Sequence, residues 1–312
     1  TLEGTLWIET SAGFCIYHPQ TESFERDMKQ VYASMGIEGK PNVVFIDRHK
    51  NFWASIPNKG IVAYNMQQQT SYEFGYTNDA RGIPQGIICS LSECRDGAIA
   101  VYEDGRMVCC DIMRQQTTAW QTDYIAANHL RKTKSLKAYA DQQDNIWLYG
   151  QGTLMIYNKS ANTWNTTFGD RLGLTSVAVD HIVNGMAGDS EGNIWIGTDR
   201  AGLIRVDAKT LETENVQPRS VNDKSNSDEV IGVQSVYVDD TDLLWVGTEK
   251  SGVAYYGNSI YKFATNLLGD ITAMAQVGDS TVWYGTGNRG VIGYNGVLAS
   301  TKVSCMATTP DG

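Results

Sequence analysis

Four short loops in this chain carry a cation beside a glycine, and these cations are well placed to bind an anion. The loops read IPNKG, TDRAG, TEKSG and TGNRG, and their cations are Lys59, Arg200, Lys250 and Arg289. If the side chains point to one place, they form a basic site for a carboxylate or sulfate, which arginine binds through two parallel hydrogen bonds. The alternative is that they are solvated loop charges, with Asp199 and Glu249 beside two of them.

Longer polar connections supply further candidates for ligand binding. They read NDARGIPQG, YIAANHLRKTKS and GDRLGLTSVAVDH. Their candidate residues are His129, Arg131 and His181, with Arg81, Lys132 and Arg171 nearby and Tyr124 and Trp120 as aromatic groups for stacking on a sugar ring. Because function is carried by loops on a rigid scaffold, we expect these connections and the four cations to form the ligand-binding face.

The cation-bearing loops belong to a repeat that runs through the chain. Seven copies align on one position of an apolar run, at Trp7, Trp53, Ala100, Trp147, Trp195, Trp245 and Trp283. Each copy has an apolar segment before this run, a turn rich in Asp, Gly and Asn between the two, and a further strand after the glycine. Four short strands every 40 to 50 residues are typical of a propeller blade. The runs are apolar at nearly every position, as in sheets covered on both faces.

The two ends of the chain supply complementary parts of one blade. The segment Val303 to Ala307 reads as a first strand without a Trp strand, and Leu6 to Ile8 reads as a Trp strand without a first strand. We therefore predict that they pair, closing an all-β, seven-bladed propeller of four-stranded antiparallel blades. We expect residues 1–312 to be one domain, excised from a larger receptor. The segment FERDMKQVYASM is expected to form a single turn or a loop.

The repeated tryptophans and glycines have a packing role in this interpretation. A bulky residue at one strand position of every copy fills the space between blades, so Trp195 is part of the scaffold. Six glycines are assigned to turns and close blade contacts: Gly197, Gly202, Gly247, Gly252, Gly285 and Gly290. A phosphate site is not expected, because no glycine-rich loop opens a helix.

Charge and composition limit the partners. The net charge of -10 argues against nucleic acid, since phosphate binding needs a positive surface. No apolar run approaches the roughly 18 residues of a membrane span, so membrane contact would come only through parts of a parent chain. The six cysteines form no CxxC or Cys/His pattern, and we expect reduced, mostly buried thiols: Cys15, Cys89, Cys94, Cys109, Cys110 and Cys305.

The phrases EGNIWIGTDRAGLIRVD, LLWVGTEKSGVAYY and TVWYGTGNRGVIGYN resemble two-component regulator propeller repeats. The resemblance covers the whole chain, is best in repeats five to seven, and weakens in repeats one to three. It implies a periplasmic sensor region of a Bacteroidetes hybrid two-component system that responds to oligosaccharides and regulates polysaccharide utilisation. Its partners would be an oligosaccharide or neighbouring receptor domains, with a homodimer in the full receptor. A full-length parent would carry histidine kinase activity, whereas this domain is not expected to be an enzyme.

Catalysis has weak support in the sequence. The histidines His18, His49, His129 and His181 have no metal-ligand spacing, and no nucleophile motif is present. We therefore expect no catalytic residue, no metal and no cofactor. The phrase DSEGNIW is similar to the Asp-box turn of sialidase propellers, but its Asp-to-Gly spacing is one residue longer. A glycosidase, or a lyase of the streptogramin type using His129 or His181, is the alternative, and a protein-interaction scaffold is a third reading.

Overall fold

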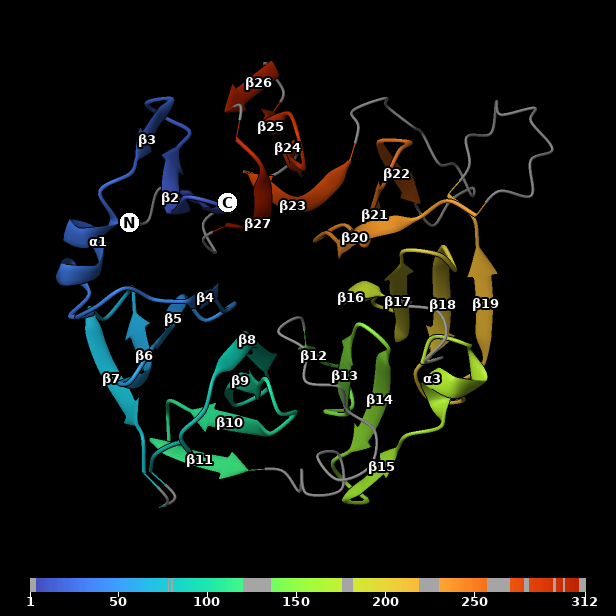
Figure 1. The fold of residues 1–312 in the computed structure, drawn as a ribbon, viewed down its shortest axis with the longest axis horizontal. Helices are drawn as coiled ribbons and strands as arrows, with labels where there is room; N and C mark the ends of the chain where they lie inside the picture. The colour runs from blue at the N-terminus through green and yellow to red at the C-terminus, as the bar shows by residue number, and fades with distance from the viewer. Residues whose placement is uncertain are drawn as a thin grey trace. The chain divides into compact units, whose positions relative to one another are not determined.

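The computed structural model describes most of the chain. The described residues are 4–77, 79, 81–119, 136–175, 182–218, 230–256, 270–277, 281–293, 296–299 and 301–308. The chain divides into two compact units, one formed by Asp27–Asp180 and the other by Leu2–Arg26 with His181–Gly312. In both units the described secondary structure is almost entirely antiparallel sheet (Figure 1).

The first unit contains three four-stranded sheets, which are three blades. Each begins with the strand that precedes the Trp run and continues outward in chain order. The first comprises β4 (Val43–Ile46), β5 (Asn51–Ile56), β6 (Gly60–Asn65) and β7 (Thr70–Gly75). The second comprises β8 (Ile88–Cys94), β9 (Gly97–Tyr102), β10 (Met107–Asp111) and β11 (Gln116–Ala119). The third comprises β12 (Lys137–Ala140), β13 (Ile146–Gly150), β14 (Thr153–Asn158) and β15 (Thr163–Asn165).

The second unit contains four blades, one of which has three strands among the described residues. One comprises β16 (Val183–Gly188), β17 (Asn193–Thr198), β18 (Leu203–Asp207) and β19 (Thr213–Val216). The three-stranded blade comprises β20 (Val233–Val238), β21 (Leu244–Thr248) and β22 (Val253–Tyr256). The next comprises β23 (Ile271–Val277), β24 (Thr281–Thr286), β25 (Gly290–Gly293) and β26 (Gly296–Ala299). The last joins the ends of the chain: β27 (Val303–Thr308), β1 (Leu6–Thr10), β2 (Gly13–His18) and β3 (Ser23–Glu25).

The pairing of the chain ends confirms the predicted closure. β27 lies beside β1 in antiparallel register, with Trp7 opposite Ala307 and Ile8 opposite Met306. Seven antiparallel sheets with this strand order are those of a seven-bladed β-propeller, so the predicted fold class is confirmed. The second strands β5, β9 and β17 are buried along their whole length, as their continuous apolar sequences indicated.

Among the described residues, two short helices are the exceptions to this all-β pattern. α1 (Met28–Ser34) replaces the turn or loop expected for this segment. The side chain of Asp27 accepts a hydrogen bond from the backbone N–H of Lys29, which caps the first turn, and Met28 and Tyr32 bury one face of the helix. α3 (Phe168–Arg171) is a single turn, with the guanidinium of Arg171 5.1 Å from the ring centre of Phe168.

A carboxylate fixes the repeated tryptophan in four blades. The indole N–H of Trp195 donates a 2.8 Å hydrogen bond to Asp189, six residues earlier, and the same bond joins Trp245 to Asp239. In the first unit Trp53 and Trp147 donate to Asp47 and Asp141 at 2.8 and 3.0 Å. Each aspartate also accepts a backbone N–H of its own turn, at Asn51, Asn145, Asn193 and Leu243. We call this arrangement the Asp–Trp clamp; it ties the end of a first strand to the second strand.

The blade formed by β8–β11 has a different residue at the Trp position from the one expected. Trp53 packs against the blade that follows it, in a cluster with Ile88 and Leu91. Ala100 lies in that same cluster and so faces backwards, whereas Ile99 packs against Leu148 of the following blade. Ile99 therefore occupies the Trp position, and the assignment to Ala100 was wrong by one residue. The cause is a turn that is one residue shorter. Two residues separate Cys94 from its partner Gly97, whereas three residues separate Asp47 from Asn51 in the preceding blade.

Candidate functional site

Three loops of the second unit, after β17, β21 and β24, are closed by the same threonine clamp. Thr198, Thr248 and Thr286 end these strands and are fully buried. Each hydroxyl donates to the carbonyl of the glycine four residues later, at 2.8, 2.6 and 2.9 Å. Each also accepts the backbone N–H three residues later, from Ala201, Ser251 and Arg289. The three loops therefore have equivalent backbones that carry different side chains.

These loops are also tied to the segment that leads into the first strand of their own blade. The residue after each threonine donates its backbone N–H to a carbonyl that directly precedes β16, β20 or β23. The pairs are Asp199 with Ile182 at 3.1 Å, Glu249 with Gly232 at 2.9 Å, and Gly287 with Asp270 at 3.0 Å. Asp199 accepts the N–H of Ile182 as well, at 2.9 Å. Loop and blade connection thus form one rigid edge, as a binding surface requires.

The threonine clamp shows which of the predicted cations are equivalent. Arg200 and Lys250 both stand two residues after the clamping threonine, whereas Arg289 stands three residues after Thr286. Arg200 lies on the surface, with 59% of its side chain exposed and its Nε 3.6 Å from Asp199. An exposed pair of this kind contributes little to stability and leaves guanidinium N–H groups free to bind an anion.

Lys59 lies in the first unit and contacts an outer strand. Its Nζ is 3.3 Å from the carboxylate of Glu73 on β7 and 3.8 Å from Glu38, which follows α1. This cation is therefore directed along its own blade towards acidic partners. A role for Lys59 in ligand binding remains a prediction that these contacts do not favour.

Several sequence candidates lie outside the described residues. They are His129, Arg131 and His181, together with Trp120, Tyr124 and Lys132. Their roles stay predictions. Arg81 is described, and its backbone N–H donates to Asp79 in a turn of the NDARGIPQG connection.

A cavity of about 350 Å³ lies at the predicted loop face of the first unit. It is formed by the loop after β5 and by the connection to β8, two of the segments proposed from the sequence. Its lining includes Ser55, Asn58, Tyr76, Gln85 and Ile87. Amide and hydroxyl groups beside an aromatic ring and an exposed isoleucine suit a ligand with many hydroxyls and an apolar face, such as a sugar. These loops were predicted from the sequence, but these residues were not, because they carry no charge.

A larger cavity of about 620 Å³ in the same unit was not anticipated. It opens at the opposite ends of the strands, where first strands turn into second strands, and its lining includes Arg48, Glu93, Arg95, Tyr139 and Asp144. Ion pairs join neighbouring blades here: Arg48 to Glu93 at 2.7 Å, and Arg95 to Asp144 at 3.0 Å. Burial raises the pKa of the Glu93 carboxyl, and Arg48 offsets this only in part.

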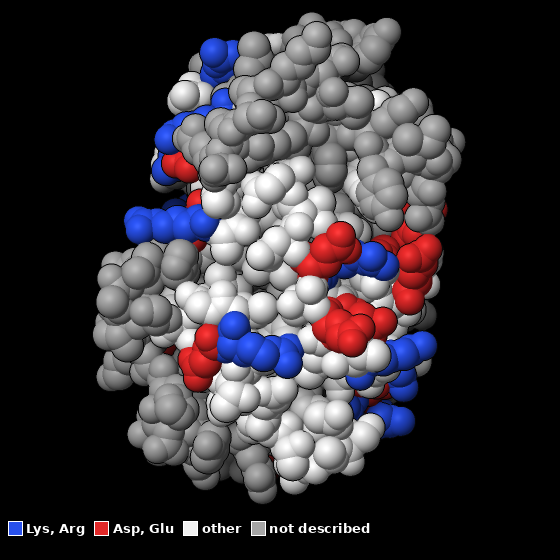
Figure 2. Space-filling view, turned by 90° about the vertical axis from the view of Figure 1, so that its right-hand side faces the viewer, with Lys and Arg blue, Asp and Glu red and all other residues white. Residues whose placement is uncertain are grey.

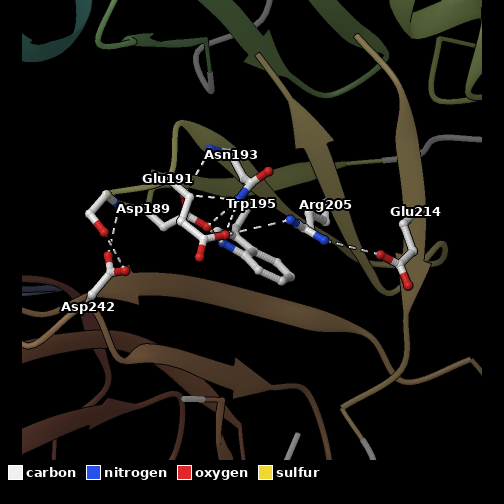
Figure 3. Close-up of polar contacts among 8 residues, drawn as sticks. Asp189, Glu191, Asn193, Trp195, Arg205, Glu214 and Asp242 are labelled. Atoms are coloured by element: carbon white, nitrogen blue, oxygen red, sulfur yellow. Dashed lines mark hydrogen bonds and ion pairs between the residues drawn. The ribbon is translucent and has the colours of Figure 1, made fainter. Parts of the chain in front are cut away.

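The second unit joins two neighbouring blades at the equivalent turns. Ser190 donates its backbone N–H and its hydroxyl to Asp242, at 2.8 and 2.7 Å. Beside this contact, Arg205 lies between Glu191 and Glu214, at 3.9 and 3.5 Å (Figure 3). The turn acids are thus engaged in structural contacts within and between blades.

One face of the protein carries both basic and acidic side chains. On the face drawn in Figure 2, most of the visible basic side chains lie next to acidic ones. Within the described ranges, no group of three His, Cys, Asp or Glu side chains is placed to hold a metal ion. None of the helices in this part of the chain is long and apolar enough to cross a membrane.

The blade of β16–β19 contains both the threonine clamp and the Asp–Trp clamp. The match to a known family falls on the repeat that forms this blade. Residues 178–200 match the family model described as "Two component regulator propeller". The resemblance found in the sequence is confirmed at this repeat. No curated protein matches the chain in sequence.

Solved structures with the same fold include extracellular domains of two hybrid two component systems from B. thetaiotaomicron. One is the extracellular domain of the hybrid two component system BT4673, at 17% identity and a TM-score of 0.56, covering 93% of this chain and 37% of that chain. The other is that of BT3049, at 15% identity and a TM-score of 0.50, covering 96% and 45%. PorZ of Porphyromonas gingivalis, a surface component of the type-IX secretion system, has 14% identity and a TM-score of 0.58, covering 89% and 42%. This chain spans less than half the length of each. At these identities the likeness shows a shared fold.

Proposed function

We propose that this chain is an extracytoplasmic sensor domain of a hybrid two-component receptor. The match of residues 178–200 to the regulator propeller repeat supports this proposal, as do structural neighbours that are extracellular domains of such systems. The periplasm is the proposed location, and the parent chain would carry the histidine kinase. Neighbouring receptor domains, or a second copy in a homodimer, would be its protein partners.

The proposed ligand is an oligosaccharide whose recognition regulates polysaccharide utilisation. The observation that carries this choice is the 350 Å³ cavity at the loop face, where Asn58, Gln85 and Tyr76 offer amides and an aromatic group. In the second unit, the exposed cations Arg200 and Lys250 are separate candidates for binding an acidic sugar. A sensor must also bind its ligand with different affinity in two arrangements of the receptor, since equal affinity shifts no equilibrium.

Calorimetric titration of this chain with neutral and acidic oligosaccharides tests the proposal. Binding of one oligosaccharide that is recovered unchanged, as checked by mass spectrometry, is the expected result. If the oligosaccharide is cleaved, the lyase or glycosidase alternative replaces the sensor. If no member of a broad panel binds at millimolar concentration, the oligosaccharide proposal is rejected, and the interaction scaffold becomes the better account.

A further inference from the structure

Two buried cysteines meet in the blade of β8–β11. The Sγ atoms of Cys94 and Cys109 are 3.1 Å apart, and both residues are 7% exposed. Cys94 ends the first strand β8, and Cys109 lies within the third strand β10, opposite Ile99 of β9. The contact therefore spans three strands of one sheet.

The cysteine pair stands where other blades have the Asp–Trp clamp. The clamping aspartate comes two residues after the first-strand partner of the tryptophan, as Asp47 follows Phe45 and Asp141 follows Tyr139. Ser92 is the first-strand partner of Ile99, so Cys94 occupies the aspartate position. An isoleucine in place of tryptophan has no N–H to donate, and this blade therefore lacks the polar clamp.

We propose that Cys94 and Cys109 form a disulfide that replaces the Asp–Trp clamp in this blade. A disulfide has an S–S distance of about 2.05 Å, so the sulfurs need to approach by about 1 Å. Because β9 lies between the two residues, this approach requires the end of β8 to move towards β10 in addition to side-chain rotation. The bond would close a short loop of the chain and hold the end of β8 to β10. For these two residues the inference departs from the reduced thiols expected from the sequence.

The reaction needs a small thiol oxidant, such as an organic disulfide, and a route to one sulfur. The Cys94 thiolate attacks the oxidant disulfide, releasing one thiol and forming a mixed disulfide. The Cys109 thiolate then attacks Cys94 Sγ and releases the second thiol. Two cysteine thiols lose two electrons and two protons, and one oxidant disulfide becomes two thiols. Cys94 lines the 620 Å³ cavity, which gives it access to solvent.

The electrostatics assign Cys94 as the attacking residue. The hydrogen bond from the Cys109 thiol lowers the pKa of Cys94, and the same contact raises the pKa of Cys109. A thiol with a lowered pKa supplies more thiolate at neutral pH.

Two neighbouring cysteines serve as controls because their environments differ. Cys110 packs towards the preceding blade, with Trp53 and Ala98, so its side chain leaves the sheet on the opposite face from Cys109. Cys89 donates to the backbone carbonyls of Val101 and Leu136 at 3.3 and 3.4 Å, and burial raises its pKa to about 11. Neither has the geometry of the Cys94–Cys109 pair.

The test is peptide mapping of the folded, full chain after incubation with oxidised glutathione. Trypsin leaves Cys89 and Cys94 in one peptide and Cys109 and Cys110 in another, so a Cys89→Ser/Cys110→Ala variant places one cysteine in each. The protein is then denatured without reductant and alkylated. We expect the two peptides joined, with a mass two daltons below their sum, in at least half of the molecules, and separation after reduction.

Two results would overturn the proposal. One is full alkylation of Cys94 and Cys109 after incubation with the oxidant. The other is a link from either residue to Cys15 or Cys305 in place of the mutual link. Because the assay contains no oligosaccharide, its outcome is independent of the sensor function.

Discussion

The carboxylate of Asp239 accepts a 2.8 Å hydrogen bond from the indole N–H of Trp245, and in the same turn it accepts the backbone N–H of Leu243 at 3.0 Å. Its neighbour Asp240 is exposed. The two aspartates are adjacent and carry the same charge, yet only Asp239 forms the Asp–Trp clamp. They therefore allow the contribution of the clamp to be measured against a matched surface position.

Asp239→Ala should lower the free energy of unfolding by about 2 kcal/mol, because the indole and the turn N–H groups lose their acceptor. Asp240→Ala should change it by less than about 0.5 kcal/mol, as is usual for an exposed position. Urea denaturation followed by tryptophan fluorescence measures both variants. Equal effects would mean that the clamp adds nothing beyond its charge.

The clamp should also make stability depend on pH. Burial opposes ionisation of Asp239, but the hydrogen bonds from Trp245, Thr241 and Leu243 outweigh it, so its pKa lies below the ordinary 3.8. A depressed carboxyl pKa gives stability that is present above the unfolded value and is lost as pH falls through the folded value. Between pH 5 and pH 3 the wild type should lose more unfolding free energy than Asp239→Asn. Parallel curves for the two proteins would contradict this assignment.

The glycine of each Trp-strand phrase makes a close blade contact in the second unit. A Cβ on Gly197 would lie 2.6 Å from Cγ1 of Val233 on the next blade, whereas a Cβ on Gly185 would lie at an ordinary 3.4 Å from Val236. Gly197→Ala should therefore destabilise the protein by about 2 kcal/mol, and Gly185→Ala should be tolerated. Thermal unfolding of both variants tests the comparison, and equal melting temperatures would show that the blades can move apart without cost.

The threonine clamp should control the rigidity of the loop that carries Lys250. Thr248→Val keeps the shape of the buried side chain but removes the acceptor of the Ser251 N–H and the donor to Gly252. A loss of about 1.4 kcal/mol would make exchange of the Ser251 amide about ten-fold faster. Thr213→Val, on an exposed position of β19, is the control. Unchanged exchange in Thr248→Val would mean that the loop is held by other contacts.

Much of the fold could be predicted because the repeat is a local pattern. The recurrence of Trp195 and its equivalents gave seven blades, and the unmatched strands at the two ends gave the pairing of β27 with β1. The anchor in the blade of β8–β11 was misplaced at Ala100 because a turn one residue shorter leaves no mark in an apolar sequence. The α1 helix was missed because its buried apolar residues, Met28 and Tyr32, are only about one helical turn apart.

The candidate site was harder to predict because it depends on side-chain direction. The sequence placed Lys59 with Arg200 and Lys250, but the ion pairs of Lys59 with Glu73 and Glu38 turn it towards an outer strand. Asn58 and Gln85 line one cavity although they lie on separate loops, and the spacing of residues in the sequence does not predict this. The contact between Cys94 and Cys109 could not be predicted either, because it depends on the register in which β8, β9 and β10 pair.

The central claim is that the loop face binds an oligosaccharide, and variants at its 350 Å³ cavity test it most directly. Asn58→Gly/Gln85→Ala removes two lining amides, and glycine suits the left-handed backbone of Asn58, whose φ is 63°. Gln143→Ala, an exposed change at the opposite ends of the strands, is the control.

The measurement is isothermal calorimetry of the wild type and both variants with an oligosaccharide that binds the wild type. The account predicts that Asn58→Gly/Gln85→Ala weakens binding at least ten-fold, about 1.4 kcal/mol, while Gln143→Ala leaves it unchanged. Equal affinity in all three proteins would contradict it and place the ligand elsewhere.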